Sequence, residues 1–117
     1  MTRDEKNKVL LEFAGFQQSS YEGYTYATGR CMWLDPDGDS CNAPDFFDPE
    51  LGIAWGFKWL VPLLSSWCMY SGAIPFGESF KQGIYAEVSL AGKEALEFAK
   101  EPAEALAEAV VKLLEAE

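Results

Sequence analysis

The strongest signals for the fold lie in two stretches, Trp33-Leu34-Asp35-Pro36-Asp37-Gly38 and Pro44-Asp45-Phe46-Phe47-Asp48-Pro49-Glu50. The first predicts a strand that runs into a tight turn, because Pro36 presets φ and Gly38 relieves the backbone. A short return strand over residues 39–42 would complete a hairpin. The second stretch predicts the start of a helix.

This central helix is predicted to run from Asp48 to Leu64. Asp48 suits the N-cap, and Pro49 suits the first helical position. The inner face is predicted to consist of Ile53, Phe57, Leu60, Val61 and Leu64. Trp55 and Trp59 lie on the opposite side. A helix that is apolar on both faces is usually buried on two sides, which predicts a layered fold or a contact with a second copy in a homodimer.

Two further helices are predicted at the ends of the chain. Thr2 and Glu5 fit a capping box, and residues 3–14 carry an apolar face before Gly15, which suits a helix end. The inward residues of this helix are predicted to be Val9, Leu10, Phe13 and Ala14. The last helix is predicted over about residues 102–116. Its inward residues are predicted to be Leu106, Val110, Leu113 and Leu114.

The clearest strand is predicted over residues 84–90, which alternate with a period of two. Strands are also predicted over residues 24–33 and 67–71. Residues 94–100 fit either a helix or an edge strand, and the edge strand is favoured. Residues 72–83 hold four turn-forming residues and predict a long exposed connection. The predicted fold class is α+β, with a mostly antiparallel β-sheet packed with helices in the order α-β-β-α-β-β-(β)-α. Residues 1–117 are predicted to form a single layered domain.

Several short motifs carry a resemblance to a known family. They are Leu11-Glu12-Phe13-Ala14-Gly15-Phe16, Trp33 with Pro36-Asp37-Gly38, Pro44-Asp45-Phe46, Ala54-Trp55, Lys58-Trp59-Leu60-Val61-Pro62 and Glu101-Pro102-Ala103-Glu104-Ala105-Leu106-Ala107. In these motifs the chain resembles the phage αβα-sandwich (ABA sandwich) domain family of small phage and prophage proteins. The resemblance implies a sandwich-like layering and a mobile-element setting. It supplies no catalytic residues.

Charge and cysteine content narrow the classes of function. The chain has 19 acidic and 9 basic residues and a net charge of −10, which repels phosphate and argues against direct nucleic-acid binding. Three cysteines are too few for a disulfide framework, and no signal-peptide pattern is present, so we expect the host cytoplasm. Residues 51–70 are long enough to span a bilayer, but Lys58 near the middle and the break at Pro62 argue against a membrane segment.

No catalytic site, metal site or cofactor is predicted. The chain has no histidine, which excludes Ser-His-Asp, Cys-His and most zinc arrangements. Asp35, Asp37 and Asp39 have the spacing that begins a calcium loop, but Gly38 and Phe46 occupy the wrong loop positions. We therefore expect a polar turn there.

Six glutamates near the C-terminus follow steps of three, four or seven residues: Glu94, Glu97, Glu101, Glu104, Glu108 and Glu115. A solvated face is the simpler interpretation of such a row. The alternative is a surface that mimics the charge row of a nucleic acid and occupies a basic groove on another protein. Glu101, Glu104 and Glu108, together with Trp55 and Trp59, are the candidate partner-binding residues.

These observations favour a non-enzymatic phage or prophage accessory protein that binds a host protein, with counter-defence inhibition through the acidic surface as the specific hypothesis. One alternative is a small-ligand, nucleotide-type binding protein that stacks its ligand on Trp and Tyr rings beside a cation such as Arg30 or Lys81. The second alternative is a small carboxylate-based enzyme.

Overall fold

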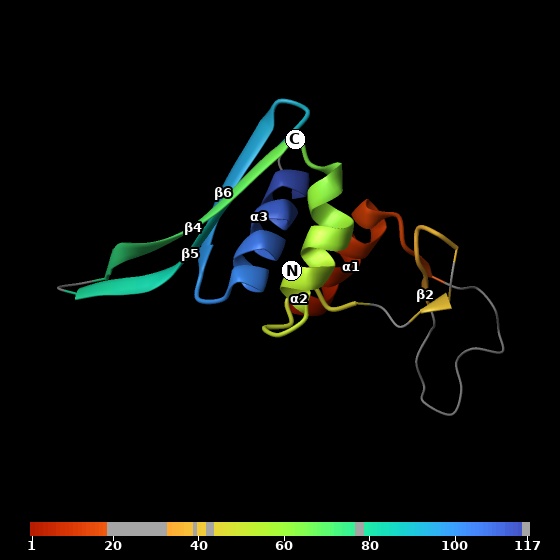
Figure 1. Ribbon diagram of the computed structural model, residues 1–117, viewed down its shortest axis with the longest axis horizontal. Helices are drawn as coiled ribbons and strands as arrows, with labels where there is room; N and C mark the ends of the chain where they lie inside the picture. The colour runs from red at the N-terminus through yellow and green to blue at the C-terminus, as the bar shows by residue number, and fades with distance from the viewer. Residues whose placement is uncertain (19–32, 39, 42–43, 77–78, 116–117) are drawn as a thin grey trace.

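A computed structural model describes residues 1–18, 33–38, 40–41, 44–76 and 79–115 (Figure 1). The elements in chain order are α1 (Arg3–Ala14), β1 (Gln17–Gln18), β2 (Trp33–Leu34), β3 (Ser40–Cys41), α2 (Gly52–Trp55), the π-helix η2 (Gly56–Leu60), the 3-10 helix η3 (Val61–Leu63), β4 (Ser66–Phe76), β5 (Ser79–Leu90), β6 (Lys93–Ala99) and α3 (Pro102–Glu115). The predicted α+β class is confirmed, and the predicted order of elements roughly matches the observed one, which has a third short strand, β1, before the predicted hairpin. Most of the strand predicted over residues 24–33 lies outside the described residues.

β4, β5 and β6 form an antiparallel sheet in that order. β5 pairs with β6 from Ile84 to Leu90, so the strands predicted over residues 84–90 and 94–100 are confirmed. The loop between them consists of Ala91 with φ 53° and Gly92 with φ 82°. Two positive φ angles are what a two-residue type I′ hairpin loop requires.

The prediction of a long exposed connection over residues 72–83 is wrong, because β4 and β5 stay paired through this region. Gly72 and Gly83 face each other across the two strands. The rings of Tyr85 and Phe98 occupy the space that side chains at these two glycines would need. The glycines therefore serve ring packing within the sheet rather than a loop.

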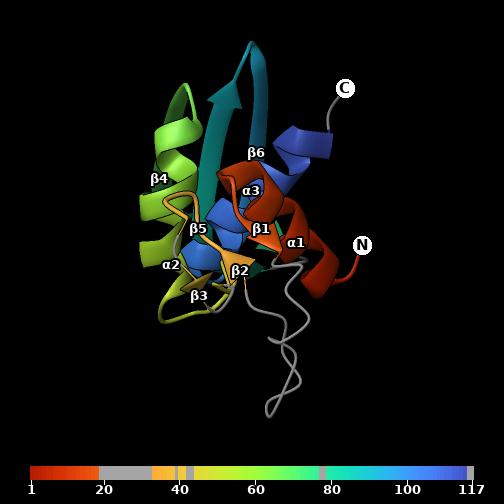
Figure 2. The ribbon, with the colours of Figure 1, turned by 90° about the vertical axis from the view of Figure 1, so that its right-hand side faces the viewer.

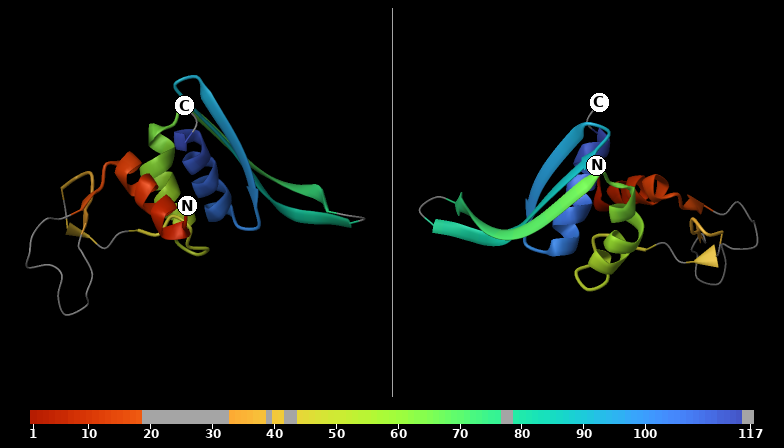
Figure 3. Two further views of the ribbon diagram at one scale, coloured as in Figure 1. Left: turned by 180° about the vertical axis from the view of Figure 1, so that it is seen from behind. Right: turned by 45° about the horizontal axis from the view of Figure 1, so that its top comes forward.

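The β4–β5 hairpin extends beyond the end of β6. The last residue of β5 that pairs with β6 is Ile84, so residues 72–76 and 79–83 pair only with each other. We call these two segments the arm. Figures 1 and 3 show the arm projecting away from the helices.

α3 is the central layer of the described structure. It contacts β5 and β6 on one side and α1, α2 and η2 on the other (Figure 2). Its buried residues are Ala103, Ala105, Leu106, Ala107, Ala109, Val110, Val111 and Leu113. The predicted last helix is confirmed, and of its four predicted inward residues only Leu114 is half-buried rather than buried.

The described helices all lie on one side of the main sheet, which differs from the αβα sandwich-like layering that we expected. The sheet face toward α3 carries small or aliphatic buried residues: Ala86, Val88, Ala95 and Ala99. These residues let α3 pack closely on the sheet. The layers therefore run from the sheet to α3 and then to α1 with the central helical segment, and no described helix covers the opposite sheet face.

The predicted start of the central helix at Asp48 is wrong, because the α-helix begins at Gly52 and its N-cap, Leu51, makes no side-chain cap bond. Asp48 instead caps the turn that leads into the helix. Asp48 Oδ1 accepts hydrogen bonds from the backbone N–H groups of Glu50 at 2.8 Å and Leu51 at 3.2 Å. The segment then continues as an α-helix, a π turn and a 3-10 turn. Pro62 lacks the N–H that an α-helix would need at this point, which accounts for the irregular end.

The predicted inner face of this segment is wrong in part. Leu60 is buried as predicted, but Phe57 is 41% exposed, and the other buried positions are Gly52 and Gly56. A Cβ atom on Gly56 would lie 2.7 Å from Leu106 Cδ2, so the absence of a side chain there lets α3 approach closely. Close packing against α3, rather than side-chain size, decides which face is buried.

The N-terminal helix and the first turn agree with the sequence. Thr2 Oγ1 accepts from the Glu5 N–H at 3.2 Å, and Gly15 ends α1 with φ 97°. Leu10, Leu11 and Ala14 are the buried residues of α1, whereas Val9 and Phe13, which we predicted to point inward, are half-buried. The small antiparallel sheet β1-β2-β3 contains the predicted hairpin, with its turn closed by a 2.9 Å bond from the Gly38 N–H to the Asp35 carbonyl oxygen.

Within the described residues, no helix combines the length and the apolar character needed to cross a membrane. Residues 51–70, which we weighed as a bilayer span, are divided among short helical turns and the start of β4.

Candidate protein-binding surface

The sheet face opposite α3 is the most distinctive surface of the described structure. Strand alternation and the observed register place nine described residues of the sheet body on it: Ser66, Cys68, Tyr70, Tyr85, Glu87, Ser89, Glu94, Leu96 and Phe98. We call this set the outer face. Tyr70 is 45% exposed and Leu96 is 43% exposed.

Three aromatic rings form a row across the three strands. Tyr70 and Tyr85 are stacked, with ring centroids 5.2 Å apart and an interplanar angle of 18°. Tyr85 and Phe98 have centroids 4.8 Å apart and are tilted by 59°. The register sets this row, because Tyr70 lies opposite Tyr85 and Tyr85 lies opposite Phe98. The row offers both π faces and apolar edges to a partner.

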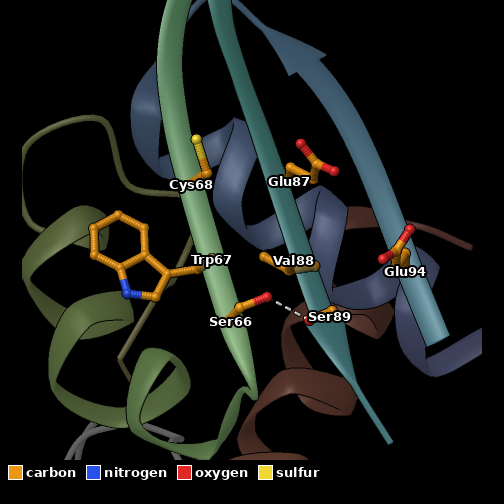
Figure 4. Close-up of a pocket in the computed structure, with 7 residues that line it drawn as sticks. All are labelled: Ser66, Trp67, Cys68, Glu87, Val88, Ser89 and Glu94. Carbon is orange, nitrogen blue, oxygen red and sulfur yellow. Dashed lines mark hydrogen bonds between the residues drawn. The ribbon is translucent and has the colours of Figure 1, made fainter. Parts of the chain in front are cut away.

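A shallow pocket of about 310 Å³ lies beside this row, toward the β5–β6 loop. Figure 4 shows its lining: Ser66, Trp67, Cys68, Glu87, Val88, Ser89 and Glu94. The hydroxyl groups of Ser66 and Ser89 form a 2.5 Å hydrogen bond across β4 and β5. Glu87 and Glu94 are exposed, and none of the nine residues of the outer face is Lys or Arg. The outer face therefore carries two carboxylates without a cation among its own members.

The three glutamates predicted to bind a partner, Glu101, Glu104 and Glu108, lie on a different part of the molecule from the outer face. Glu101 precedes α3 and Glu104 lies in its first turn, and both are exposed. Glu108 is paired with Lys6, whose Nζ lies 2.9 Å and 3.1 Å from its two carboxylate oxygens. This hydrogen bond is the main cause that raises the pKa of Lys6. Part of the predicted acidic row is thus neutralised within the chain.

Trp55 and Trp59 are half-buried and pack against the core. The Trp59 ring meets Phe16 edge-on with centroids 5.3 Å apart, and Lys58 Nζ lies 4.8 Å from the Trp59 centroid. Both tryptophans therefore have contacts within the fold, which leaves only part of each ring for a partner.

The turn that begins at Asp35, which has the spacing of a calcium loop, is stabilised by hydrogen bonds within the turn itself. Asp35 Oδ1 accepts from the Asp37 N–H at 2.9 Å, and Asp39 lies outside the described residues. In the described part of the chain, no group of three or more His, Cys, Asp or Glu side chains is placed to hold a metal ion.

Sequence reasoning missed the outer face as a site. The alternation of Tyr85, Glu87 and Ser89 was a signal for it, but Tyr70 and Phe98 join the row only through the strand register. No family model matches the chain, and searches of curated proteins and of solved structures found no match. The resemblance to the phage αβα-sandwich family stays a prediction.

Proposed function

We propose that this protein is a non-enzymatic binding protein that holds a basic segment of a partner protein on its outer face. The observation that carries the proposal is the aromatic row of Tyr70, Tyr85 and Phe98 beside Glu87 and Glu94, on a sheet face that no described helix covers. Open apolar surface of this kind, with a charged margin, is characteristic of interaction sites.

The chemistry of the outer face suits Lys and especially Arg side chains. A guanidinium group stacks on an aromatic ring and also binds a carboxylate through two hydrogen bonds. Tyr85 and Glu87 are two positions apart on the same side of β5, so one arginine side chain can contact both. The net charge of −10 would also steer a basic partner toward the molecule.

The resemblance to phage and prophage proteins makes a host protein the proposed partner, and inhibition of a host defence protein the proposed role. The exposed carboxylates of Glu101 and Glu104 form a second candidate surface for a basic groove. The two surfaces lie on different elements, so separate variants can distinguish them.

The nucleotide-type alternative needs a cation beside the stacking rings. The pocket next to the row is lined by Glu87 and Glu94 and by no basic residue, which favours a cationic group over an anionic ligand. Arg30 and the side chain of Lys81, which we named as cations for this alternative, lie outside the described residues.

The experiment is a pull-down from host lysate with three matched baits, followed by mass spectrometry. The baits are the wild type, an outer-face variant (Tyr70→Ala with Glu87→Gln) and an acidic-helix variant (Glu101→Gln with Glu104→Gln). We expect the wild type and the acidic-helix variant to capture the same basic protein, with less capture as salt rises. Loss of that protein from the acidic-helix variant alone would assign binding to α3 instead. Equal capture by all three baits would refute both surfaces.

A further inference from the structure

We infer that the free edge of β4 pairs with β4 of a second copy, in antiparallel orientation about a two-fold axis at Tyr70. The two three-stranded sheets would then form one sheet of six strands. This inference goes beyond the proposed function and does not depend on it.

The two edges of the main sheet differ in how they are protected. Proteins usually guard an exposed strand edge with charged residues, because unpaired N–H and C=O groups recruit other strands. β6 carries Lys93, Glu94 and Glu97, whereas β4 has no charged residue in its 11 positions. β4 is at the edge of the sheet, since the strand order is β4-β5-β6. Its sequence is that of a strand with neighbours on both sides.

The direction of the backbone groups follows from one observed bond. The Ser65 N–H donates to the Ser89 carbonyl oxygen at 2.8 Å, so the polar backbone groups of Ser89 point toward β4. In an antiparallel pair the hydrogen-bonded positions alternate. The residues of β4 that face β5 are therefore those opposite Ser89, Glu87 and Tyr85. The residues whose N–H and C=O groups point away from β5 are Trp67, Met69, Ser71 and Ala73.

These four positions can pair with the same four positions of a second copy in one strand register. When Tyr70 lies opposite Tyr70 of the second copy, Met69 pairs with Ser71 and Trp67 pairs with Ala73. Every outward N–H and C=O of the four residues then has a partner. The next outward position is Pro75, which has no N–H and cannot extend the ladder. The pairable edge thus ends where the self-complementary register ends.

The side chains fit the same arrangement. Trp67 is 43% exposed and lies against Phe57, which is 41% exposed, with ring centroids 4.9 Å apart. In the dimer Ala73 of the second copy lies beside Trp67, so a small residue meets a large one. On the outer face, the Tyr70 rings of the two copies become neighbours, which joins the two aromatic rows into one.

Pairing also gives the arm a second neighbour. A two-stranded ribbon without a third strand is marginally stable in water. In the proposed register Gly72 and Ala73, at the base of the arm, lie beside Cys68 and Trp67 of the second copy. Stacking of two outer faces against each other is a poorer arrangement, because it would bring the Glu87 and Glu94 carboxylates of both copies together.

The first test measures the oligomeric state of the full chain by sedimentation equilibrium. We expect a dimer that tightens as salt rises, because two copies each carry a charge of −10 and salt screens their repulsion. The proposed basic partner has the opposite salt dependence, so failure of one proposal is distinguishable from failure of the other. Ser71→Pro removes an outward N–H and should give a monomer, and Ser71→Lys should weaken the dimer by repulsion. Leu96→Lys, on the other edge strand, is the control and should stay dimeric.

The second test identifies the strand register between the two copies by a disulfide cross-link. It does not require that the fold accept a new proline in β4. Tyr70→Cys, combined with Cys68→Ser, places two thiols opposite each other at a non-hydrogen-bonded pair, where Cα atoms are about 4.5 Å apart and a disulfide can form. Mild oxidation should give a covalent dimer through residue 70, mapped by mass spectrometry. Leu96→Cys in the same background should give no cross-link through residue 96. A wild type that is monomeric at all concentrations and salt levels, or a cross-link through residue 96 instead of 70, would overturn the inference. If the wild type is a monomer and captures a host protein that Ser71→Pro does not capture, a strand of that host protein, and not a second copy, occupies the β4 edge.

Discussion

The ring of Tyr85 occupies the space that a side chain at Gly72 would need, since a Cβ atom there would lie 2.7 Å from Tyr85 Cε2. Gly83, opposite Gly72 on β5, has the same relationship to Phe98. A Cβ atom on Gly83 would additionally lie 2.7 Å from the Ala99 carbonyl oxygen. The two glycines therefore leave the space that two rings of the aromatic row occupy.

Gly72→Ala and Gly83→Ala should both lower the free energy of unfolding, by about 1–3 kcal/mol. We expect the larger effect at Gly83, because a strand carbonyl cannot move aside as a ring can. Denaturant unfolding gives the free energies, and near-ultraviolet circular dichroism reports the Tyr70–Tyr85 stack. Ser71→Ala, at an exposed position of β4, is the control and should change little. A Gly72→Ala variant less stable than Gly83→Ala would contradict this account.

Gly52→Ala should destabilise the protein more than Gly56→Ala. A Cβ atom on Gly52 would lie 2.5 Å from the Phe46 carbonyl oxygen and 3.0 Å from Ala103 Cβ, and neither atom can rotate away. At Gly56 the obstacle is the Leu106 Cδ2 methyl group, which can move with its side chain. We expect losses of about 3 kcal/mol and about 1 kcal/mol, within the range for overpacked cores. Thermal unfolding of both variants would show the order, and gains in stability would refute the close approach of α3.

Trp59→Ala should lower stability by about 3 kcal/mol, at the low end of the range for truncation of a large aromatic residue, because Trp59 is half-buried. Its loss removes the edge-on contact with Phe16. We expect no change in oligomeric state, since the inferred dimer uses β4. A Trp59→Ala protein of full stability that has become monomeric would instead place Trp59 at an interface between copies.

Lys6→Gln should remove a stability contribution of about 0.5–1 kcal/mol at neutral pH, since the Lys6 and Glu108 side chains are only 27% and 28% exposed. The pKa of Lys6 is raised in the folded state, chiefly by its hydrogen bond to Glu108. The contribution is therefore complete below the unfolded-state pKa of lysine and is lost as pH rises through the higher folded-state pKa. Wild type and variant should converge in stability at strongly alkaline pH. Lys112→Gln, which breaks the longer 3.4 Å pair with Glu97, is the control and should have a smaller effect.

Asp48→Asn should make the melting temperature depend less on pH between neutral and acid pH. The backbone N–H groups of Glu50 and Leu51 lower the pKa of Asp48. A carboxylate with a depressed pKa stabilises the fold above its unfolded-state pKa, and the contribution is lost as pH falls through the folded-state pKa. Asparagine caps a helix comparably but does not titrate. The melting temperature of Asp48→Asn should therefore fall less than that of wild type between neutral and acid pH, whereas Asp48→Ala should be less stable already at neutral pH. Identical acid profiles for wild type and Asp48→Asn would contradict the lowered pKa of Asp48.

The sequence alone determined the features that depend on neighbouring residues. Thr2 and Gly15 cap and end α1 as predicted, and Asp48 accepts hydrogen bonds from backbone N–H groups two and three positions further on. The alternation over residues 84–90 and the turn at Gly38 are likewise local, and both were confirmed. Local signals suffice here because capping, turn geometry and strand alternation are set by chain chemistry over a few residues.

Only the tertiary structure decided which faces are buried and which stay open. Phe57 has the size of a core residue, yet the close approach of α3 at Gly52 and Gly56 leaves it exposed. The candidate surface depends on the same kind of information, since Tyr70, Tyr85 and Phe98 come from three strands and meet only through the register. The physical reason is that burial and cross-strand contact depend on the packing of distant segments, which the side-chain pattern of a single segment does not encode.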